Sequence, residues 1–308
     1  MEGAVFFFPW EVRLMEWLQG SADGIFGKIV PLFSNLGEEL VLVAILGFLY
    51  WCLNKQWAKY LAVNLLAALM AGPLIKNILR RCRPYMDHPA IRCLKPVDAS
   101  ADLMDIAAQG YSCPSMHAAN AVSIYGSLAA RVKAKWLRIL LAVVPLLVGF
   151  SRVYVGVHYP SDVLLGWVIG GAALLLFSWL QRKIRNPLVF LGILGILSLP
   201  GWFYCTSDDF YSAYGLLAGI LLGFRFEEIK VKFENTRVPL HCILRILGGL
   251  IVFLAISSGS KLLFPAALLE GNGFPAHFVR AARYAVAAFA SIGVYPLAFR
   301  YAGKTGKK

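Results

Sequence analysis

The sequence predicts an all-α membrane protein, a polytopic helical bundle with about nine transmembrane helices. Hydrophobic residues make up 59% of the 308 and charged residues only 15%, whereas a soluble domain carries roughly 25% charged residues. The apolar runs approach the ~20 residues that a helix needs to cross hydrocarbon. Transmembrane strands would show segments of about ten residues that alternate in polarity, and the sequence has none. Composition and run length therefore both favour helices.

The first 35 residues mix aromatic and acidic side chains. Phe6–Phe8, Trp10 and Trp17 are interspersed with Glu11 and Glu16, a pattern typical of an amphipathic helix that lies in the membrane interface. We therefore interpret 1–35 as an interfacial N-terminal segment.

Nine apolar runs follow, and each is predicted to cross the membrane. They occupy residues 37–54, 57–79, 116–132, 137–152, 161–181, 187–204, 210–224, 240–263 and 278–299, of which 210–224 is the weakest. No connection is longer than 84–113, and no internal repeat is found. We expect a single membrane domain over 1–308, with core helices in 57–182 that carry the candidate catalytic residues and additional spans in 187–300.

The charge pattern predicts the topology. Alternate connections are basic, whereas the intervening ones are acidic. The basic set is Lys55, Lys59, Arg131, Lys133, Lys135, Arg138, Arg182, Lys183, Arg185, Arg225, Lys230, Lys232, Arg237, Lys304, Lys307 and Lys308. Basic loops stay in the cytoplasm, so nine spans place the N-terminus outside and the C-terminus inside. The net charge of +13 then indicates contact with anionic membrane lipids and no nucleic-acid partner.

The first of three polar motifs is KNILRRCRP, Lys76–Pro84. Lys76 and Arg83 are two helical turns apart and share one face, and Pro84 ends the helix. Two cations at a helix end can clamp a phosphate. The alternative is a basic cluster that reaches lipid headgroups, which is what we expect of Arg80 and Arg81.

The second motif is PSMH, Pro114–His117, at the start of an apolar run. A helix N-terminus offers unpaired N–H groups and partial positive charge to an anion. Ser115 can cap this helix or donate its hydroxyl to a phosphate oxygen, and His117 in the first turn can reach the same anion. The alternative is a capping serine beside an interfacial histidine.

The third motif is SRVYVGVHYPSD, Ser151–Asp162. Arg152 ends one span, His158 lies in the loop, and Asp162 opens the next span. A carboxylate four residues after His158 can accept the proton of one ring nitrogen, which leaves the other free to attack. A capping Asp162 with an incidental His158 is the alternative. All three motifs map to the extracytoplasmic side, which predicts one outward-facing site.

The pattern K-x6-RP, PS-x-H and SR-x5-H-x3-D resembles, in order over 76–162, the three-part signature of the type 2 phosphatidic acid phosphatase superfamily. The resemblance implies phosphoryl transfer without a metal or other cofactor. His158 would attack phosphorus and form a phosphohistidine, Asp162 would orient it, and His117 would protonate the leaving oxygen. The phosphate-binding groups would be Lys76, Arg83, Ser115, Arg152 and the amides near Met116. Met116 stands where the family usually has glycine.

The expected function is a lipid phosphatase that hydrolyses a phosphomonoester or diphosphate of a membrane lipid at the extracytoplasmic face. One alternative is a soluble sugar-phosphate phosphatase of the glucose-6-phosphatase kind, since the predicted topology is similar to that enzyme and to sphingosine-phosphate phosphatase. The other is a transporter of phosphorylated solutes, for which the intramembrane charges Arg245, Lys261, Arg280 and Arg283 are the support.

Overall fold

The computed structural model describes residues 3–299, and this part of the chain is helical, with no strand longer than one isolated bridge. The predicted all-α class is confirmed. The chain divides into two compact units, which we call unit 1 (Met1–Leu42 and Ala67–Leu180) and unit 2 (Val43–Leu66 and Gln181–Lys308). The single membrane domain stays a prediction. The basic tail at Lys304, Lys307 and Lys308 lies outside the described residues.

Within residues 3–299, six helices are long and apolar enough to cross a membrane: Lys55–Leu79, Lys135–Tyr154, Pro160–Leu180, Pro187–Tyr204, Pro239–Leu263 and Phe274–Ala298. A pair bent by 50°, Ile25–Gly37 with Glu39–Leu53, could form a seventh. The chain is therefore an integral multi-pass membrane protein. The other two predicted spans correspond to α7 (Met116–Ala129), which has only 14 residues, and α12 (Asp208–Phe226). Nine spans and the orientation of the termini stay predictions.

Unit 1 contains the three polar motifs. Its elements are α1 (Pro9–Gln19), α2 (Ile25–Phe33), η1 (Ser34–Gly37), the second half of α4 (Lys55–Leu79), α5 (Pro84–Asp87), α6 (Ile106–Gln109), α7, α8 (Lys135–Tyr154) and α9 (Pro160–Leu180). Prolines open α1, α5 and α9, where a missing N–H costs no hydrogen bond. Helix α7 packs against both α8 and α9.

Two glycines of α9 bring α7 close. A Cβ on Gly166 would lie 2.5 Å from the carbonyl oxygen of Ser115, and one on Gly170 would lie 2.4 Å from that of Ala119. Small residues four apart let two helix backbones approach in a membrane. The N-terminus of α7 is therefore held against the start of α9, which carries Asp162.

Helix α1 has two different faces. Trp10 and Trp17 are 47% and 75% exposed, which fits the predicted interfacial helix, whereas Glu11, Met15 and Gln19 on the other face are buried. The side-chain amide of Gln19 donates to the carbonyl oxygens of Arg92 at 2.8 Å and Tyr154 at 3.0 Å. The N-terminal segment is thus fastened to unit 1 on its buried face.

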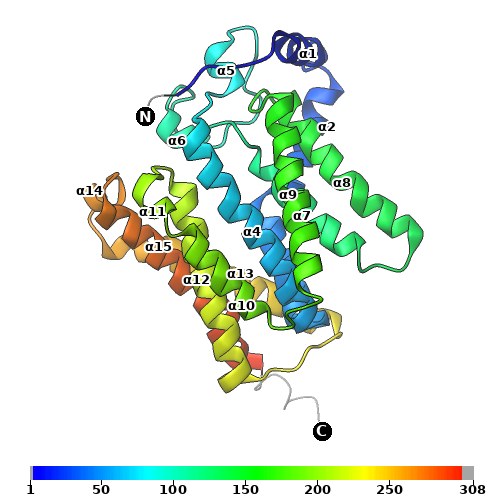
Figure 1. Cartoon of the computed structure of the whole chain (residues 1–308), viewed down its shortest axis with the longest axis vertical. Coiled ribbons are helices and arrows are strands. Elements are labelled where there is room, and N and C mark those ends of the chain that lie inside the picture. The colour runs from blue at the N-terminus through cyan, green and yellow to red at the C-terminus, as the bar shows by residue number, and fades with distance from the viewer. Residues whose placement is uncertain (1–2, 300–308) are drawn as a thin grey trace. The chain divides into compact units, whose positions relative to one another are not determined.

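Unit 2 is a second helical bundle. Its elements are most of α3 (Glu39–Phe48), η2 (Leu49–Leu53), the first half of α4, α10 (Pro187–Ser198), α11 (Gly201–Tyr204), α12, η3 (Glu227–Val231), α13 (Pro239–Gly259), η4 (Ser260–Leu263), α14 (Ala266–Leu269), α15 (Phe274–Phe289), η5 (Ala290–Val294) and η6 (Tyr295–Ala298). Helices α12 and α15 lie side by side (Figure 1). A Cβ on Gly215 or Gly219 would lie 2.2 Å from a carbonyl oxygen of α15. These glycines therefore allow the backbones of α12 and α15 to pack closely.

Candidate active site

The three polar motifs meet in unit 1, where four helices end or begin. Lys76 lies in the last turn of α4 and Arg152 in the last turn of α8, while Ser115 precedes α7 and Asp162 lies in the first turn of α9. The backbone N–H of Ser115 donates to the carbonyl oxygen of Asp162 at 2.9 Å. The second and third motifs are therefore joined directly, although the 33 residues 118–150 lie between them in the chain.

Asp162 is fully buried and held by three donors. Its Oδ1 accepts from Arg81 Nη1 at 2.6 Å, and its Oδ2 accepts from Ser112 Oγ at 2.7 Å and from the backbone N–H of Tyr159 at 2.8 Å. His158 Nδ1 lies 3.8 Å from Oδ2, which is an ion-pair distance and too long for a hydrogen bond. Catalytic hydrogen bonds are often this long without substrate.

The environment of His158 favours the neutral imidazole. Burial lowers the pKa of His158 to about 3, and the nearby cations of Arg83 and Arg152 add to the effect, while Asp162 opposes it. Since a positive charge in a low-dielectric site is costly without a close partner, the ring is neutral at neutral pH. A neutral imidazole has a lone pair that can attack phosphorus.

Several buried polar atoms of the described residues have no hydrogen-bond partner, and three of them belong to predicted site residues. They are Ser115 Oγ, Arg152 Nε and His158 Nδ1. A buried polar group without a partner costs about 1–3 kcal/mol, and such groups in a native protein call for an explanation. A site that binds an anion supplies one, because an anion would accept from both Ser115 and Arg152.

Arg83 does more than the predicted phosphate clamp requires. Its Nε donates to the carbonyl oxygens of Gln109 and Gly110 at 2.9 and 3.0 Å, its Nη2 to that of Gln109 at 2.7 Å, and its Nη1 to that of Val157 at 3.0 Å. The guanidinium therefore ties the long 84–113 connection to the residue that precedes His158. Lys76 is likewise buried, at the end of α4.

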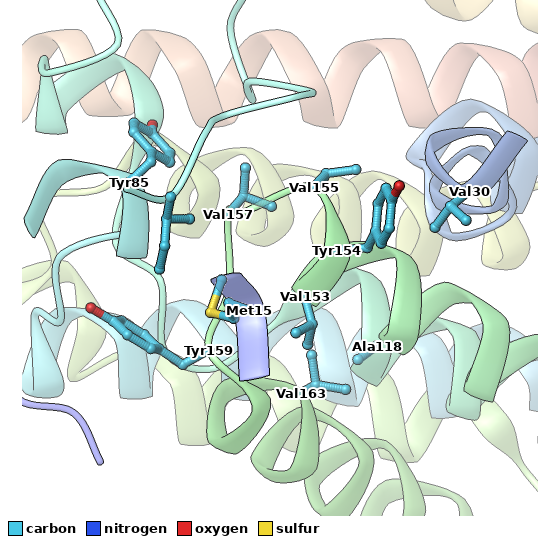
Figure 2. Close-up of a cluster of buried hydrophobic side chains, with 11 residues drawn as sticks. Met15, Val30, Tyr85, Ala118, Val153, Tyr154, Val155, Val157, Tyr159 and Val163 are labelled. Carbon is cyan, nitrogen blue, oxygen red and sulfur yellow. The ribbon is translucent and has the colours of Figure 1, made fainter. Parts of the chain in front are cut away.

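The loop that carries His158 is fixed by a hydrophobic cluster. Val153, Val155, Val157 and Val163 are buried together with Met15 of α1. Figure 2 shows Val153, Val155 and Val157 gathered around Met15, with Tyr159 beside them. Because these residues flank His158 on both sides, their packing holds the position of its backbone.

Comparison with known proteins identifies the family. Residues 56–186 match the model described as PAP2 superfamily, and residues 211–307 match the one described as PAP2 superfamily phosphatase, transmembrane extension. The chain is 34% identical over 183 residues to phosphatidylglycerophosphatase B of Bacillus subtilis, which covers 55% of this chain and 78% of that protein. The chain belongs to the PAP2 superfamily.

Two further relatives differ in the extent of the match. The undecaprenyl-diphosphatase of Sulfolobus acidocaldarius is 28% identical over 162 residues, which cover 52% of this chain and 72% of that protein. Sphingosine-1-phosphate phosphatase 1 of Rattus norvegicus is 26% identical over 284 residues, which cover 81% of this chain and 63% of that protein. No solved structure matches the chain significantly.

The departure from the PAP2 signature at Met116 has a structural counterpart in α4. A Cβ on Gly72 would lie 1.7 Å from Met116 Sδ. The thioether therefore fills a space on α4 that exists only because residue 72 is glycine. The side chain packs against α4, and the backbone N–H of Met116 stays at the N-terminus of α7, where helical N–H groups have no partner within the helix.

The expectation that Arg81 reaches toward lipid headgroups is wrong. Arg81 is 2% exposed. Its Nη1 bonds Asp162 and the hydroxyl of Ser161, its Nη2 bonds Glu11, and its guanidinium lies 3.9 Å above the centre of the Tyr159 ring. Sequence reasoning missed Arg81, Glu11 and Ser112 as neighbours of Asp162. The one signal in the sequence was Glu11, an acidic residue within the aromatic N-terminal segment.

Proposed function

We propose that this PAP2-superfamily protein is a metal-independent lipid phosphatase that hydrolyses a phosphomonoester or diphosphate of a membrane lipid at the extracytoplasmic face. The observation that carries the proposal is the cluster of unpaired buried atoms on Ser115, Arg152 and His158. It combines donors for phosphate oxygens with a neutral histidine next to a buried carboxylate.

In the proposed mechanism the lone pair of His158 attacks phosphorus in line with the lipid oxygen. A P–N bond forms, the P–O bond to the lipid breaks, and His117 gives its proton to the leaving oxygen. His117 then takes a proton from water, the hydroxide attacks phosphorus, and the P–N bond breaks to release phosphate. Asp162 compensates the positive charge that the ring of His158 acquires. General acid–base help of this kind contributes about 10²–10⁴-fold.

The transition state spreads negative charge over the equatorial oxygens of the phosphoryl group, and stabilising that charge is the main catalytic task. We assign it to Lys76, Arg83, Ser115, Arg152 and the amide of Met116. The last of these lies at a helix N-terminus, where the dipole also favours an anion.

The orientation of three helices supports an extracytoplasmic site. Helix α4 begins at Lys55 and, with 25 residues, is about 37 Å long at ~1.5 Å per residue, so its two ends fit opposite membrane surfaces. Helix α8 begins at Lys135 and ends next to the site, and α9 begins at the site and ends before Arg182. Each helix thus has its basic connection at the end away from the site, and basic connections stay in the cytoplasm.

A lipid substrate is favoured over the two alternatives. The relatives named above act on lipids according to their names, and none is a sugar-phosphate phosphatase. Three of the four charges that suggested transport have local partners. Arg280 pairs with Asp208 at 2.6 Å, and Arg245 donates to the carbonyl oxygen of Trp51 at 2.7 Å. Arg283 also bonds within the helical bundle, to Ser260.

Phosphate release by the purified protein in detergent, with EDTA present, tests the proposal. The panel contains phosphatidate, phosphatidylglycerophosphate, a sphingoid-base phosphate, a polyprenyl diphosphate and glucose 6-phosphate. We expect release from at least one lipid and none from His158→Ala. Exclusive hydrolysis of glucose 6-phosphate, or wild-type turnover by His158→Ala, would contradict the proposal.

A further inference from the structure

Glu11 is a buried carboxylate that the proposed mechanism does not use. It is 0% exposed, although it lies on the N-terminal helix α1, outside the residues that the PAP2 model matches. Its Oε1 accepts from the backbone N–H of Ser161 at 2.8 Å, and its Oε2 accepts from Arg81 Nη2 and from the backbone N–H of Phe8, each at 3.0 Å. A buried carboxylate is costly unless it is paired in this way, so these contacts need a reason.

Arg81 is shared between two carboxylates. Its Nη2 binds Glu11, while its Nη1 binds Asp162 at 2.6 Å. The three side chains carry two negative charges and one positive charge, so the cluster has a net charge of −1. If Glu11 were absent, Arg81 would cancel the charge of Asp162 and the net charge would be zero.

The net charge of this cluster matters for His158. The ring of His158 lies 3.8 Å from Asp162 and becomes positive as it attacks phosphorus. A net negative neighbour stabilises that charge, and the effect is large in a site with little water. An Arg81–Asp162 pair without Glu11 would hold the carboxylate in place but would give His158 much less stabilisation.

We propose that Glu11 is a positioning residue for the phosphatase reaction, which acts through Arg81 to keep Asp162 oriented and the cluster net negative. The inference rests on the proposed function. It makes the N-terminal helix a part of the active site, because that helix supplies the second carboxylate.

The variant Glu11→Gln tests this inference in the purified full-length protein. Residues that orient the ligands of a metal site cost about 10–100-fold when they are mutated, and we expect a fall in kcat of similar size for a residue that orients Asp162. KM should stay close to the wild-type value, because Glu11 does not touch the substrate phosphate. Glu11→Asp keeps the charge and should recover part of kcat.

Two control variants separate positioning from folding. Glu16→Gln removes an exposed carboxylate from the same helix and should leave kcat unchanged. Gln19→Ala removes the hydrogen bonds that fasten α1 to Arg92 and Tyr154, so it should lower the melting temperature without the selective loss of kcat.

The double variant Glu11→Gln with Arg81→Gln gives the sharpest readout. It leaves Asp162 as the only charge of the cluster and so restores the net charge of −1. We expect its kcat to exceed that of Glu11→Gln alone. A purely structural role of the two residues predicts instead that the double variant is at least as impaired as the single one, and a double-mutant cycle measures the difference.

The outcomes for the two proposals differ. If the wild type and Glu16→Gln release no phosphate from any lipid in the panel, the proposed function fails, and the inference fails with it. If the wild type is active and Glu11→Gln has the same kcat, only the inference is overturned. A parallel loss of kcat and melting temperature in Glu11→Gln and Gln19→Ala, with no rescue in the double variant, also overturns it.

Discussion

Each unit of the molecule contains a buried ionic cluster, and the two clusters differ in charge balance. In unit 2, Lys55 Nζ lies 2.6 Å from Glu227 and Lys59 Nζ lies 2.7 Å from Glu228. The hydroxyl of Tyr50 also donates to Glu227, at 3.3 Å. These two cations and two carboxylates balance, and Arg225, which is 63% exposed, adds a further cation 3.8 Å from Glu228. In unit 1, Glu11, Arg81 and Asp162 have a net charge of −1.

The atoms around the two clusters differ as well. Among the described residues, no ionisable side chain of either cluster has a buried atom without a hydrogen-bond partner, but beside the unit 1 cluster three candidate-site side chains do: Ser115, Arg152 and His158. A buried ion pair is therefore weak evidence for catalysis by itself. Excess negative charge together with unpaired neighbouring donors sets the unit 1 cluster apart and supports the proposed phosphatase site.

The largest expected difference is in turnover. Asp162→Asn keeps the shape of the side chain and removes its charge, so we expect kcat to fall by about 10²–10⁴-fold, as for the loss of a group that supports proton transfer. Glu228→Gln in unit 2 should leave kcat per folded molecule unchanged. Phosphate release normalised to folded protein checks both. Equal losses in the two variants would remove the distinction between the clusters.

The stability of the fold tests the unit 2 cluster. Glu227→Ala leaves Lys55 without its partner and weakens the pairing of Lys59, which is 2% exposed. Removing one partner of a buried pair costs about 3–5 kcal/mol, so we expect a clearly lower melting temperature in detergent. Adding Lys59→Met to the Glu227→Ala variant should recover part of the lost melting temperature. A melting temperature unaffected by Glu227→Ala would mean that the unit 2 cluster contributes no stability.

The sequence predicted the helical class and the places of the three motifs relative to the helices, because both depend on local patterns. Apolar run length located the helices to within a few residues, and motif spacing placed Lys76, Ser115, Arg152 and Asp162 at helix ends and His158 in the loop between α8 and α9. The structure adds a reason why Met116 is compatible with this site, since Gly72 makes room for it.

The neighbours of Asp162 could not be predicted in the same way. Glu11 and Arg81 lie 70 residues apart in the chain, and no local pattern relates them. Arg81 looks like any basic residue at the end of a membrane helix, and only the fold of the N-terminal segment over the site shows that it faces inward. The partners of a buried charge depend on tertiary packing, which periodicity does not report.

A packing variant tests whether the unit 1 site depends on the position of α7 as well as on the charges of its cluster. Gly72→Ala would place a methyl group against Met116 Sδ, and overpacking of this kind costs about 1–3 kcal/mol. We expect a lower melting temperature and, because Met116 begins α7, a lower kcat. The double variant with Met116→Gly should restore both. If Gly72→Ala has no effect on either quantity, the site tolerates movement of α7 and depends mainly on its charges.

The smallest expected effect is a pH dependence that belongs to unit 1. The pKa of His158 is lowered by burial from its ordinary value of 6.5 to about 3. Between these two values the unfolded chain binds a proton that the folded protein excludes, so stability falls as the pH is lowered from 6.5 toward 3. The change is about 1.4 kcal/mol per pH unit.

Melting temperatures between pH 7 and pH 5 should therefore fall less steeply for His158→Gln than for the wild type, while Glu228→Gln should keep the wild-type slope. Equal slopes for His158→Gln and the wild type would mean that His158 titrates normally, and that its neutrality at pH 7 does not come from the buried site.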